Sequence, residues 1–221
     1  MLRTTSLTLC LHHTPLLQLP PLTVAPGEML TLMGPSGCGK SSLLAALAGV
    51  LPGTLGRGPF GLAGDIYLNE RRLTALPPQQ RQIGMLFQED LLFAHLSATE
   101  NLMFGLPAHM KGMAARREAA LAALHEVGLA AEADKLPSQL SGGQKARVSL
   151  LRTLLAEPAA LLLDEPFSRL DKPLRSAFRT LVFERIAARR IPAILVTHDA
   201  EDAPGAILDL MPSTSHTREE I

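Results

Sequence analysis

The stretch 34–42 reads Gly-Pro-Ser-Gly-Cys-Gly-Lys-Ser-Ser and constrains the fold more than any other part of the sequence. It fits a pattern in which two glycines enclose four residues and are followed by Lys and Ser. The apolar run Met29–Met33 precedes it and reads as a buried strand. After it, apolar residues recur at helical spacing at Leu43, Leu44 and Leu47. The sequence therefore predicts a loop that joins a strand to a helix.

This loop has the residue types that a phosphate group needs. Glycine has no Cβ, so backbone N–H groups can curl closely around an oxyanion, and the following helix adds unpaired N–H groups and the positive end of its dipole. Lys40 would lie along the β- and γ-phosphates, and the Ser41 hydroxyl would bind Mg²⁺. The alternative is a simple glycine-rich turn, which rarely carries Lys-Ser in this register. We expect a nucleoside triphosphate to contact Gly34, Pro35, Ser36, Gly37, Cys38, Gly39, Lys40, Ser41 and Ser42.

Composition narrows the class of protein. The 221 residues suffice for one large domain, or for a domain that carries an insert. The 21 basic and 21 acidic residues give a net charge of zero, so no nucleic-acid partner is expected. No apolar run approaches the roughly 18 residues that span a bilayer. The two cysteines, Cys10 and Cys38, suggest neither a disulfide nor a metal site and favour a reducing, cytosolic setting.

The pattern along the chain predicts an α/β core interrupted by a helical insert. We place the core at 1–88 and 157–221 and the helical segment at 89–156. Apolar runs predict the early strands 7–11 and 19–24 and the later strands 65–68 and 83–87, whereas Gly and Pro predict an irregular loop at 51–64.

Two features of the insert predict helices. Ser97 and Glu100 have the spacing of a capping box, so a helix should begin there. The stretch 114–129 repeats apolar residues at helical spacing and should end near Gly128. A solvated helix face accounts for its charged residues, Arg116, Arg117 and Glu118, better than a binding patch does.

A second glycine motif, Leu140-Ser141-Gly142-Gly143-Gln144, opens a long helical stretch that runs to Ala156. Ser141 and Gln144 also have capping-box spacing, so part of the motif serves to start a helix. The two glycines leave the first amides uncovered, which favours an anion at this helix end. The chain thus has a second helix end that faces an anion, although it already has a phosphate loop.

Two acids follow a buried strand in the second half of the chain. The run 159–163 is continuously apolar, as expected for a central strand of a parallel sheet, and Asp164 and Glu165 follow it. Ligands of open α/β sheets bind beyond such strand ends. Asp164 suits Mg²⁺, and Glu165 suits the orientation of an attacking water. A solvated turn is the alternative.

One further strand end carries a histidine. Asp171 precedes a predicted helix at 172–190, after which the apolar strand 193–196 leads to Thr197 and His198. A lone histidine is more often structural or exposed. Because His198 would end a strand of the same sheet, it can also reach a γ-phosphate and stabilise charge there.

Taken in order, these motifs resemble those of the ATP-binding-cassette (ABC) ATPases, and the resemblance covers nearly the whole chain. Any single motif could arise by chance, but the ordered set is highly specific. The matching positions are 34–42 for Walker A, Gln88 for the Q-loop, 140–144 for the signature, 161–165 for Walker B, 168–171 for the D-loop and His198 for the switch histidine.

The resemblance implies a P-loop ATPase core with an antiparallel β subdomain and an inserted α-helical subdomain. It implies that two such domains pair head to tail, so that each signature helix covers the ATP held by the other chain. The implied catalytic residues are Glu165, His198, Gln88 and Lys40. Mg²⁺ would be held by Ser41, Gln88 and Asp164, and ATP would also meet Ser141, Gly142, Gly143, Gln144 and Asp171.

Within the family, the motif sequences look most like those of bacterial importer subunits, and the short form is most similar to YnjD-like importer ATPases. This resemblance implies a second identical subunit, an integral membrane permease and an extracytoplasmic solute-binding protein that acts through the permease. It also implies a cytoplasmic protein that lies on the inner face of the cell membrane.

Two departures from the family pattern stand out. Leu11, His12 and His13 stand where many members place an aromatic residue on adenine, and Arg169 stands where Ala is common. Two other functions remain open. One is a soluble ABC ATPase that acts on nucleic acid or ribosomes, although such proteins tend to have long coiled coils or two cassettes. The other is a phosphate-loop kinase, which would leave 140–144 and His198 unexplained.

Overall fold

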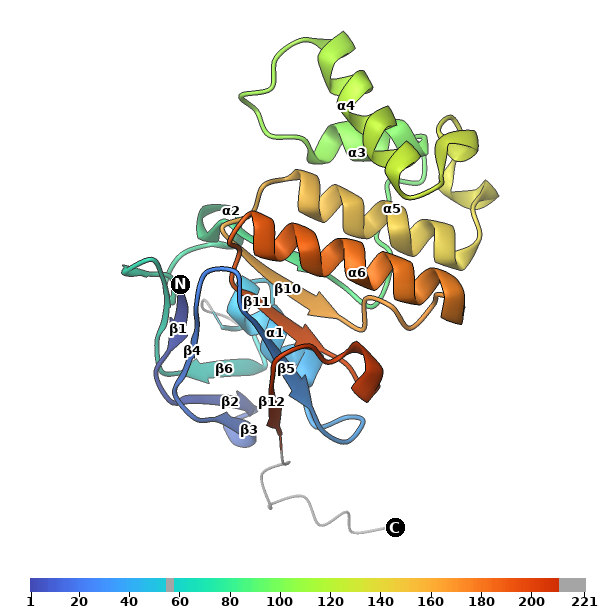
Figure 1. Cartoon of the computed structure of the whole chain (residues 1–221). Helices are drawn as coiled ribbons and strands as arrows, with labels where there is room; N and C mark the ends of the chain where they lie inside the picture. Colours follow the sequence, from blue (N-terminus) through green and yellow to red (C-terminus); the bar gives the residue numbers. More distant parts are fainter. Residues whose placement is uncertain (55–57, 211–221) are drawn as a thin grey trace. The chain divides into compact units, whose positions relative to one another are not determined.

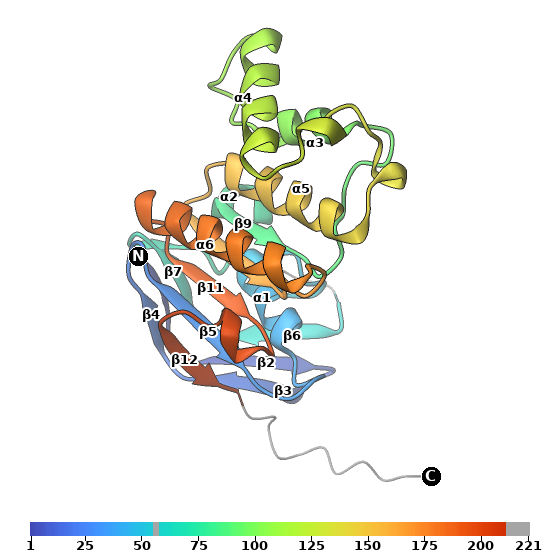
Figure 2. The same cartoon turned by 45° about the vertical axis from the view of Figure 1, so that its right-hand side comes forward.

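The computed structural model describes residues 1–54 and 58–210, and the chain divides into two compact units. Unit 1 contains residues 1–85, 159–164 and the segment that begins at 186, and unit 2 contains residues 86–158 and 165–185. Figures 1 and 2 show the elements of both units from two directions. Each unit has its own secondary structure.

Unit 1 contains three sheets. One has the strand order β12-β5-β11-β10-β9, and its β5, β10, β11 and β12 run parallel. The other two, β4-β1-β7-β8 and β3-β2-β6, are antiparallel. The expected α/β fold with an antiparallel β part is confirmed. The elements are β1 (Leu2–Thr4), β2 (Leu7–Leu11), β3 (Thr14–Leu19), β4 (Leu22–Val24), β5 (Met29–Met33), α1 (Lys40–Ala48), β6 (Phe60–Ala63), β7 (Ile66–Leu68), β8 (Arg71–Arg72), α2 (Pro78–Arg81), β9 (Ile83–Leu86, whose last residue belongs to unit 2), β10 (Ala160–Asp164), β11 (Ala193–Val196), a 3₁₀ helix (Ala200–Asp202) and β12 (Ala206–Asp209).

The core of unit 1 fixes α1 against one face of the parallel sheet (Figures 1 and 2). Successive side chains of a strand point to opposite faces, so alternate residues of neighbouring strands meet the helix. Leu43 and Leu44 of α1 and Leu32, Leu162 and Ile194 of the sheet are each at most 1% exposed. This packing holds the loop between β5 and α1 in place.

Two predictions for unit 1 were wrong. The strand predicted at 19–24 is broken at Pro20 and Pro21 because proline has no N–H group for a sheet. Pro15 is tolerated inside β3, since β3 is an edge strand. The loop predicted at 51–64 contains the strand β6, which pairs with β2, while its residues 55–57 lie outside the described part.

Unit 2 is helical. The predicted capping box is confirmed: the Ser97 hydroxyl accepts a hydrogen bond from the Glu100 amide at 3.2 Å, and the Ser97 amide donates to the Glu100 carboxylate at 2.7 Å. Among the described residues, no helix combines the length and apolar character needed to cross a membrane. The elements are α3 (Ala98–Gly105), α4 (Met113–Glu126), α5 (Gly142–Leu155), α6 (Lys172–Ala188, whose last three residues belong to unit 1) and two 3₁₀ helices (Ala130–Glu132 and Pro137–Gln139).

Arg116 differs from the predicted solvated role. Its guanidinium donates hydrogen bonds to four backbone carbonyls at and beyond the end of α3. Helix ends leave such carbonyls without intrahelical partners, so the side chain satisfies them and joins α3 to α4. The carbonyls belong to Met103, Leu106, Pro107 and Met110.

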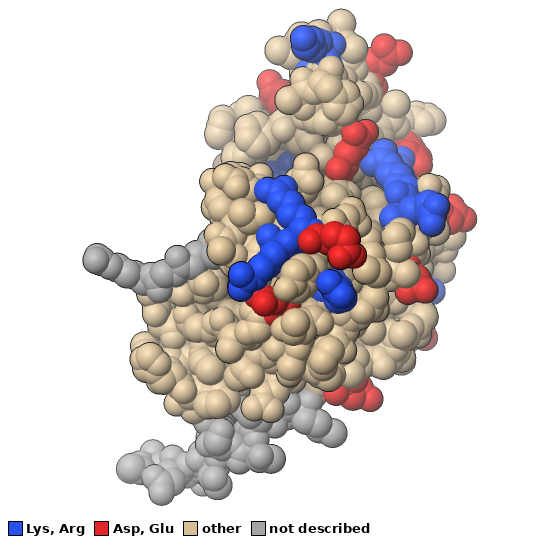
Figure 3. All heavy atoms as spheres, turned by 90° about the vertical axis from the view of Figure 1, so that its left-hand side faces the viewer, with Lys and Arg blue, Asp and Glu red and all other residues tan. Residues whose placement is uncertain are grey.

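Charges on the surface are mixed in sign. On the face drawn in Figure 3, acidic and basic side chains lie next to one another and leave wide uncharged areas between them. Arg72 and Asp65 form one such pair of opposite charges, in which an Nη atom of Arg72 lies 2.7 Å from Oδ1 of Asp65.

Arg81 ties the other end of α1 to its surroundings. It is 1% exposed, and burial lowers the pKa of its guanidinium below the usual arginine value. Its N–H groups donate to the carbonyls of Ala46 and Leu47, at the end of α1, and to those of Thr74 and Leu76, at 2.7–3.0 Å. The cation thus meets the negative end of the helix dipole and satisfies carbonyls that the helix leaves open.

We predict that Arg81→Met lowers the free energy of unfolding by about 3 kcal/mol, because it removes four hydrogen bonds, two of which are to the buried carbonyls of Ala46 and Leu47. Urea unfolding of the full chain measures this loss. Arg72→Met is the matched control, because Arg72 is 61% exposed and its ion pair should contribute below about 1 kcal/mol. Equal losses in the two variants would contradict the structural role of Arg81.

Candidate functional site

The loop between β5 and α1 has the shape of an anion cradle. Gly37 and Gly39 have φ angles of +79° and +96°, in the left-handed region that favours glycine. A Cβ on Gly34 would lie 2.5 Å from the carbonyl oxygen of Leu210, whereas one on Gly37 would meet no atom within 4 Å. The backbone is thus tightly packed on one side and open on the other. No side chain caps the first turn of α1, so its amides remain available to a ligand.

Lys40 points back over this loop. Its Nζ atom lies 2.8 Å from the carbonyl oxygens of both Gly34 and Pro35, which places the ammonium group at the mouth of the cradle. The remaining predicted residues differ in exposure: Pro35, Ser36, Gly37 and Ser41 are exposed, Gly39 and Ser42 are partly exposed, and Cys38 is buried in the core.

The register of the parallel sheet brings three predicted positions to one edge. Leu32 of β5 pairs with Val196 of β11, and Val196 pairs with Asp164 at the end of β10. Gly34 lies two residues after Leu32, and His198 lies two residues after Val196. Asp164 is 3% exposed, and His198 is exposed. The phosphate loop, a buried carboxylate and an imidazole therefore all stand at the carboxyl ends of neighbouring strands.

The oxygen groups at this edge fit Mg²⁺. Mg²⁺ usually keeps several waters and is bound by one or two protein oxygens together with substrate phosphates. Among the described residues, no cluster of three or more His, Cys, Asp or Glu could hold a metal on its own. The Ser41 hydroxyl and the buried Asp164 carboxylate suit an ion that arrives with a nucleotide. Gln88, the third predicted ligand, is an exposed residue of unit 2.

In unit 2, the glycine motif both caps a helix and leaves part of it open. The capping box is confirmed: the Ser141 hydroxyl accepts from the Gln144 amide at 3.3 Å, and the Ser141 amide donates to the Gln144 side chain at 2.8 Å. A Cβ on Gly142 would meet nothing within 4 Å, so the first turn of α5 is open there. Gly143 instead lies close to its neighbours. A Cβ added at this position would lie 3.3 Å from atoms of Arg169 and Leu170, so glycine is what allows the close packing.

Glu165 is held in an unusual backbone conformation. Its φ is +50°, although a residue before proline, here Pro166, favours extended backbone. Its carbonyl accepts hydrogen bonds from the amide and the hydroxyl of Ser168, the latter at 2.9 Å. Strained backbone of this kind concentrates at functional sites.

Asp171 has a clear local role. Its carboxylate accepts a hydrogen bond from the Leu174 amide at 3.1 Å and so caps the start of α6. The predicted contact with nucleotide would come in addition to this cap.

Sequence reasoning missed a contact between the segment after Gln88 and the D-loop. Asp90 forms an ion pair with Arg169 at 2.9 Å. Burial raises the pKa of Asp90 above that of an ordinary carboxyl, while Arg169 and Lys145 pull it down. The departure from Ala at position 169 was the visible signal, but nothing in the sequence identified its partner.

The histidines at the predicted adenine position lie in a tight turn. His12 and His13 have φ angles of +46° and +69° and join β2 to β3 as exposed residues. With Cys10 and Phe60 they line a hollow of about 460 Å³ in unit 1.

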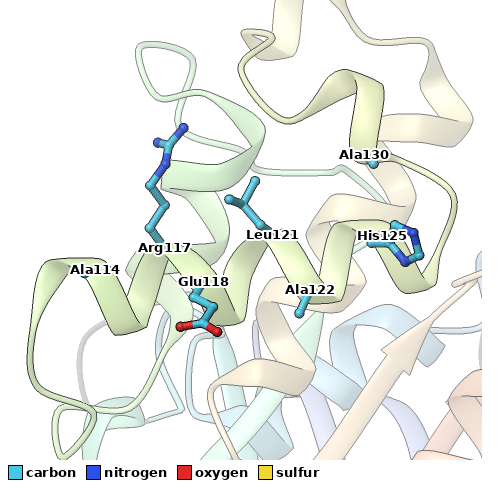
Figure 4. A pocket seen from close by; sticks show the side chains of 7 residues that line it. All are labelled: Ala114, Arg117, Glu118, Leu121, Ala122, His125 and Ala130. Atoms are coloured by element: carbon cyan, nitrogen blue, oxygen red, sulfur yellow. The ribbon is translucent and has the colours of Figure 1, made fainter.

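The larger hollow in unit 2 is unrelated to the predicted residues. It has a volume of about 610 Å³ and lies along α4. Figure 4 shows that Arg117 and Leu121 point to one side of the helix and Glu118 and Ala122 to the other. It is an open depression that contains none of the predicted site residues.

Comparisons with known proteins agree with the motifs. Residues 17–168 match the family described as ABC transporter. The chain is 51% identical over 190 residues to the ABC transporter ATP-binding protein YnjD of Escherichia coli K12, which covers 85% of each chain. It is 40% identical to the thiamine import ATP-binding protein ThiQ of Salmonella typhimurium, over 92% of this chain and 82% of ThiQ.

A solved structure shows the same fold. The ATP-binding cassette MJ0796, in a dimeric post-hydrolysis state bound to ADP and phosphate, matches with a TM-score of 0.81 and 27% identity. The match covers 95% of this chain and 94% of the other. Sequence and fold thus agree, and the chain belongs to the ABC transporter family, as an ATP-binding protein related to its importer ATPases.

Proposed function

We propose that two copies of this ATPase pair head to tail around two ATP molecules and drive solute import through a separate membrane permease. The observation that carries the proposal is the sheet register, which brings the phosphate loop, His198 and Asp164 to the carboxyl ends of three successive strands, β5, β11 and β10. The open first turn of α5 supports the pairing, because it offers a second set of amides for a phosphate. The names of the relatives support import. Thiamine, however, is the cargo of ThiQ only, as that protein's name states.

In the proposed reaction, a water oxygen attacks the γ-phosphorus while the bond to the β-phosphate oxygen breaks. Glu165 orients this water and accepts its proton. Lys40 and His198 donate hydrogen bonds to the phosphate oxygens as charge shifts, and the partner subunit's Ser141 donates from the opposite side. The products are ADP and phosphate.

Further residues complete the proposed site. Mg²⁺ held by Ser41, Asp164 and Gln88 would neutralise charge on the β- and γ-phosphates. The amides of Gly142, Gly143 and Gln144 would meet the partner's ATP, and Asp171 would contact nucleotide from the start of α6. The hollow beside His12 and His13 is the proposed place of the adenine base.

The proposed assembly has further members. An extracytoplasmic solute-binding protein would deliver solute to the permease, and the two ATPase chains would lie on the cytoplasmic face of the membrane. No nucleic acid takes part in this proposal, which accords with a net charge of zero and with the mixed charges in Figure 3.

We predict that Glu165→Gln abolishes turnover but leaves ATP binding intact and accumulates an ATP-bound dimer, because the amide cannot accept a proton. Phosphate release measures turnover, and size-exclusion chromatography with ATP and Mg²⁺ measures the dimer. Turnover close to that of the unchanged chain would refute the role given to Glu165.

We predict that Lys40→Met weakens ATP binding at least about tenfold, since a charged hydrogen bond contributes about 1.5–3 kcal/mol. Calorimetric titration of the full chain with ATP and Mg²⁺ gives the dissociation constant. The control is Lys111→Met, which removes an exposed lysine before α4 and should leave binding unchanged. Equal affinity in both variants would show that Lys40 does not contact the phosphates.

A further inference from the structure

The carboxylate of Asp90 is anchored within unit 2. It lies two residues after Gln88, its side chain is 15% exposed, and its Oδ2 atom lies 2.9 Å from an Nη atom of Arg169, which is 42% exposed. Lys145, in the first turn of α5, is the other cation that acts on it. A carboxylate this far from water depends on such partners to remain charged.

The backbone at Asp90 and Leu91 is strained and is fastened to α5. Leu91 has a φ of +43°, which is costly for a residue with a bulky side chain, and it is 51% exposed, so burial does not stabilise it. The Ser149 hydroxyl donates to the Asp90 carbonyl at 2.7 Å, and Arg152 donates to the Leu91 carbonyl at 2.9 Å. These two bonds hold the backbone of the turn, and Arg169 holds its side chain.

Arg169 in turn belongs to a compact turn that begins at Glu165. Ser168 donates twice to the Glu165 carbonyl, and the Leu170 amide donates to the Phe167 carbonyl at 3.1 Å. The carbonyl of Arg169 also packs closely over Gly143. Arg169 is thus connected to Glu165 through this turn and to the start of α5 through its own carbonyl.

We propose that Arg169 is a positioning residue for ATP hydrolysis, whose ion pair with Asp90 links the strained turn after Gln88 to the turn that carries Glu165. It touches neither ATP nor the reacting atoms. It acts by keeping Glu165 and Gln88 in a fixed relation, and this relation governs the rate of the chemical step. The inference rests on the roles proposed above for Glu165 and Gln88.

The ion pair is suited to this role more than to stabilising the fold. A partly exposed pair contributes little to the free energy of unfolding, whereas small misplacements of reacting groups reduce rates strongly. The Arg169 side chain is 42% exposed, so Arg169→Ala leaves no buried cavity and should fold. We expect Arg169→Ala to lower the rate of ATP hydrolysis.

A double-mutant cycle on the full chain tests the proposal. Turnover and KM are measured with ATP and Mg²⁺, at a protein concentration that saturates dimerisation, for Arg169→Ala, Asp90→Ala and the double variant. Each single variant should lose about fivefold in kcat with KM within about twofold, and the double variant should lose no more than the worse single one. Arg169→Lys keeps the charge and should retain most of the rate.

The control cycle uses Arg117 and Asp134, an exposed ion pair at 3.2 Å elsewhere in unit 2. Neither of its single variants should change kcat. Three results would each overturn the proposal. The first is that the losses in kcat of the two single variants multiply in the double variant. The others are an unchanged kcat in Arg169→Ala and a raised KM with a normal kcat.

The cycle separates this inference from the proposed function. If Glu165→Gln is inactive while the cycle at Asp90 and Arg169 shows no coupling, only the positioning role fails. If Glu165→Gln remains active, the role of Glu165 is wrong, and the positioning role falls with it.

Discussion

A chain of phosphates binds well where several backbone N–H donors converge without interference from side chains, and the loop between β5 and α1 in unit 1 meets this constraint. Gly34 has no room for a Cβ because the Leu210 carbonyl lies against it, and Gly37 has a backbone angle that favours glycine. The amides they expose are useful only if α1 is fixed. Packing against the parallel sheet holds one side of α1, and Arg81 holds its far end.

The residues proposed for the site come from both units of the chain. Unit 1 holds the phosphate loop, Asp164 and His198, while Glu165 and the glycine motif at the start of α5 belong to unit 2. Asp164 and Glu165 are consecutive in sequence, so the boundary between the units passes between two predicted neighbours in the site.

Much of the fold could be predicted because its signals are local. The phosphate loop, the capping boxes at Ser97 and Ser141 and the acids at the end of β10 each depend on residues a few positions apart. The break at Pro20 and Pro21 was also visible, but it was outweighed by the apolar run around it. The roles of Arg81 and Arg116 could not be predicted, because their partners are backbone carbonyls, which every residue has. Arg81 reaches α1 from 35 positions away in the sequence. Asp90 and Arg169, 79 positions apart, present the same difficulty.

The central claim is that one chain's phosphate loop works with the other chain's Ser141, and mixing inactive variants tests it most directly. In a head-to-tail pair, a Lys40→Met chain joined to a Ser141→Ala chain has one site with both defects and one site with none. An equal mixture should therefore recover about a quarter of the rate of the unchanged protein, because half of the dimers are mixed and each has one intact site. If the mixture turns over ATP no faster than the two separate variants do, each site is built from a single chain, and the account is wrong.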